Sequence, residues 1–234
     1  MQLDKFEIYI NNNTIPFHYK KVSQDMSSYF AKIIRGDIYK KINIPKKINM
    51  IVDIGANFGA ASLCFAFRYP EATIFSLEPV TETFKILEKN TSAFKTINPF
   101  NLAASNSTGV TDIYIDKNKM GRSSLIKNHL NYFFDYVEKI QSIKFMDFLE
   151  ENNIEQIDIL KIDVEGSECK IIDSIKPFLK KIACIYIESH TKDNFKKINN
   201  ILLESHLEVE TVNHKDYLFE SIYLNNLYKN TFKK

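Results

Sequence analysis

A long alternation of two kinds of segment predicts that this chain folds as an α/β protein with a mostly parallel sheet. Short apolar runs recur between residues 49 and 224, and most of them are separated by segments with helical spacing. Several runs are continuously apolar, which is typical of strands whose two faces are both covered. We therefore expect a doubly wound sheet with an N-terminal extension ahead of it.

The N-terminal extension, residues 1–47, is irregular except for one segment of helical spacing over Ser27–Ile38. A seam at Ile44–Lys47 separates it from the patterned domain, residues 48–234. In the first half of this domain, apolar runs lead into turns and then into helices. The elements expected there are strand Asn49–Ile54, helix Gly59–Tyr69, strand Thr73–Leu77, helix Thr81–Asn90 and strand Ile97–Ala103.

The second half of the domain continues the alternation but ends differently. Residues Gly109–Ile115 alternate with a period of two, which indicates one arm of a hairpin. Two strands with a short gap close the chain, and they predict an antiparallel pair at one edge of the sheet. The other expected elements are helix Met146–Asn153, strand Ile157–Ile162, helix Ser167–Ile175, strand Ile182–Ile187, helix Asp193–Glu204, and the closing strands Leu207–Val212 and Tyr217–Leu224.

The composition indicates a folded protein of one domain with a small appendage. Its 234 residues are 44% hydrophobic and 13% aromatic, which excludes a disordered chain. No apolar run approaches ~18 residues, and the N-terminus lacks the layout of a signal peptide. The three cysteines are widely separated, so they fit neither a disulfide framework nor a zinc motif. We expect a reduced, cytoplasmic protein without a membrane span.

The charge is unevenly distributed along the chain. The net charge of +2 is too small to predict nucleic-acid binding. Residues 1–50 carry +5 and residues 51–190 carry −4. The basic leader contains three lysine pairs that either form a solvated surface or attract an anionic substrate, such as a nucleotide-activated sugar. These pairs are Lys20–Lys21, Lys40–Lys41 and Lys46–Lys47.

The turn after the first strand of the domain has the pattern of a ligand-binding loop. Asp53 ends the strand, and Gly55 and Gly59 allow a tight turn whose backbone can lie against a ligand. The spacing matches neither GxGxxG nor a P-loop. Asp53 would repel a pyrophosphate and suits a ligand with an ammonium or sulfonium group. The alternative is that the glycines only build the turn.

Glu78 ends the next predicted strand, 25 residues after Asp53. A carboxylate at this place can accept hydrogen bonds from both ribose hydroxyls of an adenosine. The alternative is that the negative charge of Glu78 only stabilises the N-terminus of the following helix. Together, Asp53 and Glu78 at two strand ends indicate a ligand-binding site more specifically than either carboxylate does alone.

Three segments resemble class I S-adenosylmethionine-dependent methyltransferases. Ile51–Gly59 is similar to their first motif, and Glu78-Pro79 is similar to the second. Leu160–Glu168, LKIDVEGSE, resembles the signature of the FkbM-type methyltransferase family, and the resemblance spans roughly residues 51–190. The family usually has a glycine in the next helix, where this chain has Asp173-Ser174, so only the end of that helix is in doubt.

The resemblance implies a seven-stranded sheet with an antiparallel last strand, and S-adenosylmethionine as cofactor. It implies that Gly55 and Asn57 border the methionine end, that Glu78 holds the ribose and that Ala104 lies near the adenine. The cofactor-binding residues expected in all are Asp53, Gly55, Ala56, Asn57, Gly59, Glu78 and Ala104.

The chemistry is expected at the ends of two adjacent apolar strands, where Asp163 and Glu188 lie. An alcohol acceptor must lose its proton, so a base or a divalent metal is required. Asp163 and Glu188 are the expected ligands of Mg²⁺ or Mn²⁺, and Glu165 or His190 is the expected base. Alternatively, Asp163 and Glu165 orient substrate hydroxyls and cap the next helix, and His190 is a partly exposed loop residue. Glu168 also lies nearby in the sequence.

Two further segments have weaker patterns. Gly121–Leu125 is a polar loop that can fold over cofactor or substrate, and its Arg122 can meet a phosphate or remain solvated. Tyr132–Tyr136 is aromatic and suits a lid, a partner helix or core packing. The four histidines at residues 18, 129, 206 and 214 are assigned no function.

These observations predict an O-methyltransferase that modifies a carbohydrate hydroxyl. The expected substrate is a small molecule, a nucleotide-activated sugar for bacterial surface polysaccharide such as capsule, and no nucleic-acid partner is expected. The alternatives are a phenol, amine or carboxylate acceptor, or a non-catalytic protein that binds the cofactor. The turn spacing disfavours a nicotinamide-dependent oxidoreductase. The sequence leaves open whether the chain is a homo-oligomer.

Overall fold

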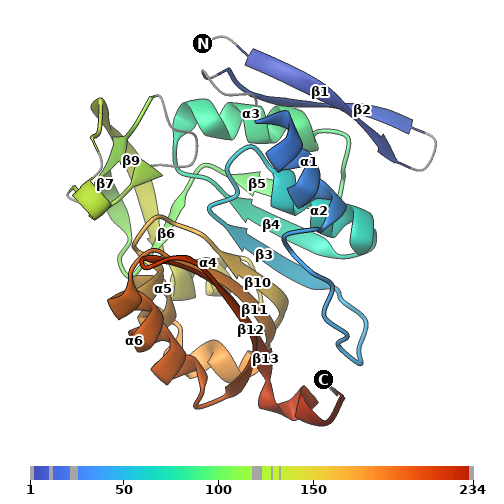
Figure 1. Ribbon diagram of the computed structural model, residues 1–234, viewed down its shortest axis with the longest axis vertical. Helices are drawn as coiled ribbons and strands as arrows, with labels where there is room; N and C mark the ends of the chain where they lie inside the picture. Colours follow the sequence, from blue (N-terminus) through green and yellow to red (C-terminus); the bar gives the residue numbers. More distant parts are fainter. Residues whose placement is uncertain are drawn as a thin grey trace.

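The predicted fold class is confirmed by a computed structural model, which describes residues 3–10, 13–21, 26–117, 123–127, 129–131 and 133–231 (Figure 1). A seven-stranded sheet with the order β12-β13-β11-β10-β3-β4-β5 forms its centre. Neighbouring strands from β5 to β11 are parallel, and β13 is antiparallel to both β11 and β12. The strands are β3 (Met50–Ile54), β4 (Thr73–Leu77), β5 (Ile97–Phe100), β10 (Ile157–Ile162), β11 (Ile182–Ser189), β12 (His206–Lys215) and β13 (Leu218–Asn225).

Helices cover both faces of this sheet. Successive residues of β3 point to opposite faces, so Ile51 packs in the cluster that includes α1, α2 and α3 while Val52 packs with α4, α5 and α6. This explains why the predicted strands are continuously apolar. The helices are α1 (Ser27–Arg35), α2 (Ala60–Arg68), α3 (Thr81–Thr91), α4 (Phe145–Glu151), α5 (Glu168–Ser174) and α6 (Lys192–Leu202), with 3-10 turns η1 (His129–Asn131), η2 (Lys176–Lys181) and η3 (Asn226–Thr231).

The predicted strand Ile97–Ala103 begins where expected, but its predicted end is wrong because the chain turns after Phe100. Strand β5 ends at Phe100, and the Asn101 amide then donates to the carbonyls of Glu78 and Pro79, each at 2.9 Å. The chain continues into a second, four-stranded sheet of order β6-β9-β7-β8. Its strands are β6 (Ala103–Ser105), β7 (Gly109–Ile115), β8 (Ser123–Ser124) and β9 (Tyr136–Lys144).

The hairpin arm expected at Gly109–Ile115 is β7, which pairs antiparallel with β9. Strand β9 itself was not predicted. Tyr136, the last residue of the aromatic run, begins β9 rather than a lid or helix, whereas Tyr132 lies outside the described residues.

The leader is more ordered than its sequence pattern suggested. Strands β1 (Leu3–Ile10) and β2 (Asn13–Lys20) form an antiparallel hairpin that was not predicted. Its Phe17 packs against Phe30 of α1, with ring centroids 5.3 Å apart. Helix α1 ends at Arg35, earlier than expected, because Gly36 adopts a left-handed conformation with φ 83°. The hairpin and α1 share one apolar cluster with the sheet.

Three lysines of the leader form ion pairs with acidic residues of the domain. Lys40 pairs with Glu210 at 2.5 Å, Lys46 with Asp158 at 2.5 Å and Lys47 with Glu71 at 2.6 Å. Asp158 is fully buried and also accepts the backbone N–H groups of Asn49 and Met50. The opposite charges of leader and domain therefore hold the two segments together at these three places.

The described part of the chain contains no helix that is long and apolar enough to cross a membrane.

Candidate active site

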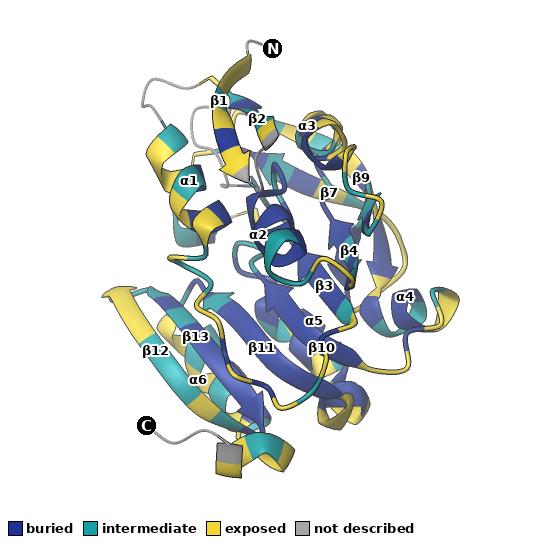
Figure 2. Cartoon of the chain, turned by 90° about the vertical axis from the view of Figure 1, so that its right-hand side faces the viewer, coloured by how far each residue is buried: buried dark blue, intermediate teal, exposed yellow. Residues whose placement is uncertain are grey.

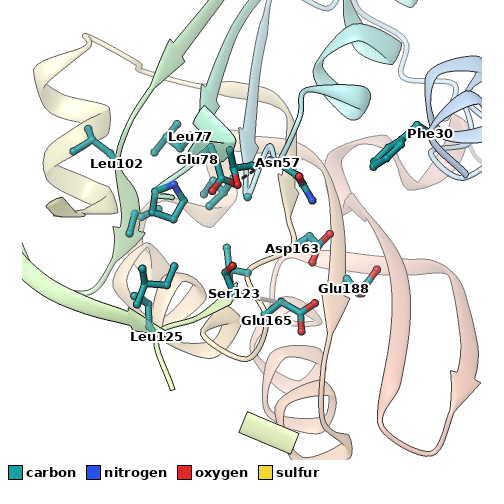
Figure 3. A pocket seen from close by; sticks show the side chains of 18 of the residues that line it. Phe30, Asn57, Leu77, Glu78, Leu102, Ser123, Leu125, Asp163, Glu165 and Glu188 are labelled. Atoms are coloured by element: carbon teal, nitrogen blue, oxygen red, sulfur yellow. Dashed lines mark hydrogen bonds between the residues drawn. The ribbon is translucent and has the colours of Figure 1, made fainter. Parts of the chain in front are cut away.

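A cavity opens at the carboxyl ends of the parallel strands, where open α/β sheets bind their ligands (Figure 3). Gly55, Asn57, Glu78 and Ala104 line it, as do the acidic residues at the ends of β10 and β11. The predicted loop after β7 also contributes to its wall, although Arg122 lies outside the described residues. Sequence reasoning missed a third part of the wall, which α1 and the residue before it provide. The lining residues from these last two segments are Ser123, Leu125, Met26, Tyr29 and Phe30.

The first turn needs glycine for steric reasons. Gly55 has φ 75°, and a Cβ at this position would lie 1.8 Å from the carbonyl oxygen of Asp163. The backbone N–H groups of Gly55 and Ala56 donate to the carbonyl of Leu77 at 3.0 and 2.9 Å. The turn is therefore held between β4 and the end of β10, with Asn57 exposed to the cavity.

Glu78 stands between the turn and the next helix. Its carboxylate accepts the backbone N–H of Asn57 at 3.1 Å and that of Val80, the residue before α3, at 2.9 Å. Burial raises the pKa of Glu78 to about 7, although both hydrogen bonds favour the ionised form. Glu78 thus caps the entrance to α3 and still lines the cavity, so the two interpretations of this residue are compatible (Figure 3).

Three of the expected cofactor residues do not line the cavity. Asp53 is fully buried beneath the turn, where Ser62 Oγ donates to it at 2.6 Å. The side chain of Ala56 is buried, and Gly59 precedes α2 with φ 89°. These residues therefore support the turn on the side that faces away from the cavity.

The counter-ion of Asp53 is Lys161, which sequence reasoning missed. Its Nζ lies 3.1 Å from Asp53 Oδ1 and donates to the carbonyl of Gly55 at 2.7 Å. The same Nζ is 4.0 Å from Asp163 Oδ2. The available signal was a lysine inside a strand that is otherwise apolar except for Asp158, because a buried lysine requires a buried anion.

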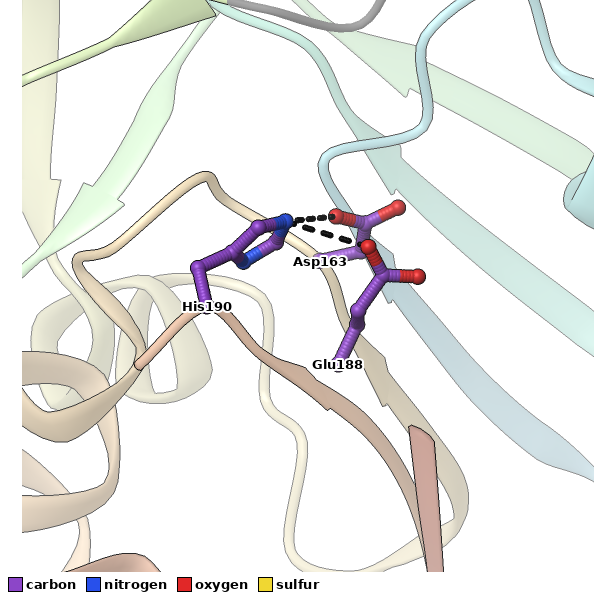
Figure 4. A group of neighbouring side chains, drawn as sticks. All are labelled: Asp163, Glu188 and His190. Carbon is purple, nitrogen blue, oxygen red and sulfur yellow. Dashed lines mark ion pairs between the residues drawn. The ribbon is translucent and has the colours of Figure 1, made fainter. Parts of the chain in front are cut away.

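Asp163, Glu188 and His190 come together at the edge of the cavity (Figure 4). One ligand atom from each lies within 4.8 Å of the others. His190 Nε2 is 3.0 Å from Glu188 Oε1, 3.3 Å from Glu165 Oε2 and 4.0 Å from Asp163 Oδ1. His190 is 2% exposed and is therefore not a solvent-facing loop residue.

Glu168 orients the His190 ring from behind. Its Oε1 lies 2.7 Å from His190 Nδ1, and the Asn194 amide donates to its other oxygen at 3.2 Å. A carboxylate on Nδ1 fixes the ring and turns Nε2 toward Asp163 and Glu188. Metal-binding and proton-accepting histidines often have such a carboxylate at their second ring nitrogen.

The pKa values of the cluster depart strongly from their usual values. Burial raises the pKa of Asp163 to about 8, and the neighbouring charge of Glu188 adds to this effect. Burial would lower the pKa of His190, but hydrogen bonds with Glu165, Glu168 and Glu188 raise it well above 6.5. Burial would raise the pKa of Glu165, yet hydrogen bonds with His129 and His190 hold it below its usual value. Such a group of carboxylates favours a proton or a cation between them.

His129 was assigned no function from the sequence, but it belongs to this cluster. Its Nε2 lies 3.5 Å from Glu165 Oε2, and its ring centroid lies 5.6 Å from that of His190. Gly166 makes this packing possible, because a Cβ there would lie 2.5 Å from His129 Nδ1. No sequence pattern predicts the contact, since η1 reaches the cluster from the second sheet.

Comparison with solved structures shows the fold of the chain. FkbM methyltransferase from Methylobacillus flagellatus KT aligns with a TM-score of 0.57 and 13% identity, over 84% of this chain and 50% of that one. A fibrillarin pre-rRNA processing protein from Methanococcus jannaschii aligns with a TM-score of 0.52 and 16% identity, over 95% and 83%. Aeropyrum pernix fibrillarin, solved with S-adenosylmethionine, aligns with a TM-score of 0.50 and 12% identity, over 94% and 82%. The fold is the class I S-adenosylmethionine-binding methyltransferase fold.

The family follows from the sequence match. The methyltransferase FkbM domain matches residues 53–219, and the chain belongs to this methyltransferase family. The chain is 26% identical to methyltransferase sdnD of Sordaria araneosa, with 66% of this chain and 74% of that protein covered. It is 28% identical to the 2-O-methyltransferase NoeI of Sinorhizobium fredii (59% and 62%) and 24% identical to the hexuronic acid methyltransferase AglP of Haloferax volcanii (69% and 64%). The matched region is thus less than two thirds of the length of NoeI and AglP.

Proposed function

We propose that this chain transfers the methyl group of S-adenosylmethionine to a hydroxyl of a carbohydrate. The observation that carries the proposal is that Asp163, Glu165 and Glu188 line the same cavity as Asn57 and Glu78. A cofactor held at the turn therefore has carboxylates beside it, and these accept hydrogen bonds from sugar hydroxyls. The names of NoeI and AglP, a 2-O-methyltransferase and a hexuronic acid methyltransferase, also support a sugar acceptor.

The geometry supports an in-line displacement. Gly55 and Asn57 would border the methionine end of the cofactor, and Glu78 would accept the ribose hydroxyls. The acceptor oxygen attacks the methyl carbon while the carbon–sulfur bond breaks, and S-adenosylhomocysteine leaves. Asp163 and Glu188 would align the hydroxyl, and Glu165 would receive its proton, or His190 Nε2 would receive it if that nitrogen does not bind a cation.

The residues also fit a divalent cation. Two carboxylates and an imidazole nitrogen are suitable ligands for Mn²⁺ or Mg²⁺, and the Glu168–His190 contact fixes the imidazole. Asp163, Glu188 and His190 would hold the ion, which would stabilise the alkoxide of the acceptor. The metal is part of the proposal, as are the nucleotide-activated form of the sugar and its use in surface polysaccharide.

The test is a transfer assay against a panel of nucleotide-linked sugars, with and without EDTA. Mass spectrometry of the products should show one added methyl group on the sugar, and EDTA should abolish the transfer. Transfer that persists in EDTA would contradict the proposed role of a metal, while the proposed sugar acceptor would stand. Cofactor binding without any methylated product would instead favour a non-catalytic binding protein.

A further inference from the structure

A second cavity lies beside the cofactor cavity and shares Asp163 and Glu188 with it. Strands β11, β13 and β12 form its floor, and none of the described helices covers this part of the sheet face (Figure 2). The segment Asp37–Lys40, which we call the strap, crosses the face between α1 and β3. The cavity is therefore a groove between strap and sheet that leads to the two carboxylates of the proposed reaction centre.

The middle of the groove is apolar. Tyr186 and Ile222 are register partners on adjacent strands, and they form a floor that is 4% and 8% exposed. Ile38 and Tyr39 of the strap also line the groove, and the Tyr39 ring packs edge-on against Tyr186 with centroids 5.9 Å apart. The Tyr186 hydroxyl donates to the carbonyl of Lys40 at 2.5 Å, which holds the strap in place. A flat apolar floor with an aromatic wall suits the C–H face of a sugar ring.

The end of the groove near the reaction centre is acidic. Glu188 and Glu220 are register partners on β11 and β13, in the row next to the apolar floor. Both line the groove together with Asp163. Glu210 lines it too, but its carboxylate pairs with Lys40 at 2.5 Å.

Acidic groups outnumber basic ones around the groove. Five carboxylates line it, and three of them have a basic partner: Asp37 pairs with Arg35 at 3.1 Å, Glu210 with Lys40, and Glu220 with the exposed His214 at 2.8 Å. Lys161 also lines the groove, but its ammonium group pairs with Asp53, which lies outside the groove. A divalent cation between Asp163 and Glu188 would offset the charge of these two residues, and Glu220 would remain as an acidic group that pairs with no lysine or arginine in the ion pairs of the described residues. A substrate carboxylate in this groove would therefore meet like charge at short range.

We propose that the groove binds the acceptor and selects a sugar ring without a carboxylate, so that a hexose is preferred to a hexuronic acid. This inference rests on the proposed function, because it assigns the acceptor of the same reaction. The ring lies against the half-buried Ile38 and Tyr39 of the strap, beside Tyr186 and Ile222, and its reacting hydroxyl points to Asp163 and Glu188. Glu220 is the specificity residue, because it adds negative charge beside the ring without belonging to the proposed reaction centre.

The experiment compares methyl transfer to nitrophenyl hexosides and to the hexuronosides of matched configuration, at pH 8. We expect kcat/KM for a hexoside to exceed that for its uronide by about tenfold or more. Glu220→Gln should lower this ratio and Glu220→Lys should lower it further. The matched control is Glu208→Gln on the same hairpin, because Glu208 is exposed and pairs with Tyr223, whose side chain packs in the cluster on the other face.

The outcomes separate the inference from the proposed function. A ratio near one in the wild-type chain, or a ratio that neither Glu220 variant changes, would overturn the inference while sugar methylation stands. If neither these glycosides nor the nucleotide-linked sugars are methylated, the proposed function fails. Calorimetry of the same glycosides with the S-adenosylhomocysteine complex then decides the inference: a Glu220-dependent preference for hexosides supports the groove assignment, and equal binding or no binding overturns it.

Discussion

The Nζ of Lys161 lies 3.1 Å from Oδ1 of Asp53 in the interior of the sheet, and the two side chains are 4% and 0% exposed. Burial alone would lower the pKa of Lys161, but the charges of Asp53 and Asp163 raise it above its usual value. The same ammonium group donates to the carbonyl of Gly55 at 2.7 Å. One buried charge thus connects the turn after β3 to the end of β10, which Asp163 follows.

We predict that Lys161→Met destabilises the fold by about 3–5 kcal/mol, because it leaves Asp53 buried and unpaired. The double variant with Asp53→Asn should recover part of this loss. Lys139→Met is the control, since Lys139 pairs with Asp112 at 3.2 Å on the surface and its removal should cost less than about 1 kcal/mol. Urea unfolding measures all three. Equal effects of the two lysine variants would show that Asp53 does not depend on Lys161.

Gly55→Ala should abolish cofactor binding or fold poorly, because its Cβ would lie 1.8 Å from the Asp163 carbonyl oxygen. Gly109→Ala is the control that distinguishes a steric clash from backbone strain. Gly109 also has a positive φ, 146°, but nothing lies within 4 Å of the position that its Cβ would take. The control should lose about 1–2 kcal/mol of stability and keep the cofactor affinity. Calorimetric titration with S-adenosylhomocysteine distinguishes the two variants. A Gly55→Ala protein with full affinity would show that the turn is not rigid.

Glu78 should make cofactor affinity and apo stability respond to pH in opposite directions. Its pKa is raised from 4.5 to about 7, so the folded apo protein binds a proton more tightly than the unfolded chain and loses stability as pH rises from 4.5 to 7. In the proposed role of Glu78, an ionised carboxylate would accept the ribose hydroxyls better than a protonated one, so affinity should weaken as pH falls through about 7. Glu78→Gln should flatten both profiles. An affinity profile that survives in Glu78→Gln would assign the titration to another group.

Much of the fold could be predicted because its strands bury both faces. The mainly apolar run at residues 157–162 and the continuous apolar run at residues 182–187 match β10 and the first part of β11 closely. The hairpin β1–β2 was missed although Phe6 and Ile8 alternate with Lys5, Glu7 and Tyr9, a pattern that indicates a strand with one buried face.

The site could be predicted where residues follow strands and not where distant segments meet. Asp163 and Glu188 come together because adjacent parallel strands end at the same edge of the sheet. The contact of His129 with Glu165 and the approach of Phe30 to the cavity depend on how separate elements pack. Neither contact leaves a local pattern in the sequence.

Protonation of His206 should destabilise the folded protein in acid. This residue is 1% exposed, its Nδ1 lies 2.8 Å from Ser205 Oγ, and its Nε2 lies 3.1 Å from the carbonyl of Ile182. Burial lowers the pKa of His206 to about 4, so the unfolded chain binds the proton more tightly and stability falls as pH drops from 6.5 to 4. The loss should be about 3 kcal/mol.

Urea unfolding at several pH values measures this loss, and His206→Gln should reduce its slope between pH 6.5 and 4. Equal slopes in the wild-type chain and His206→Gln would show that His206 is not the group responsible.

Asp163→Asn should separate methyl transfer from cofactor binding. The Asp163 side chain is 31% exposed and faces the cavity. Its backbone N–H donates to the carbonyl of Ile54 at 3.1 Å, and because the substitution keeps this backbone hydrogen bond, the turn should stay in place. We expect kcat to fall about a hundredfold or more and the affinity for S-adenosylhomocysteine to change less than about threefold. Asp173→Asn, on the exposed part of α5, is the matched control and should change neither quantity. Because Asp163 lies 4.0 Å from both Lys161 Nζ and His190 Nε2, equal losses of kcat and affinity would mean that its charge supports the cofactor turn rather than the acceptor.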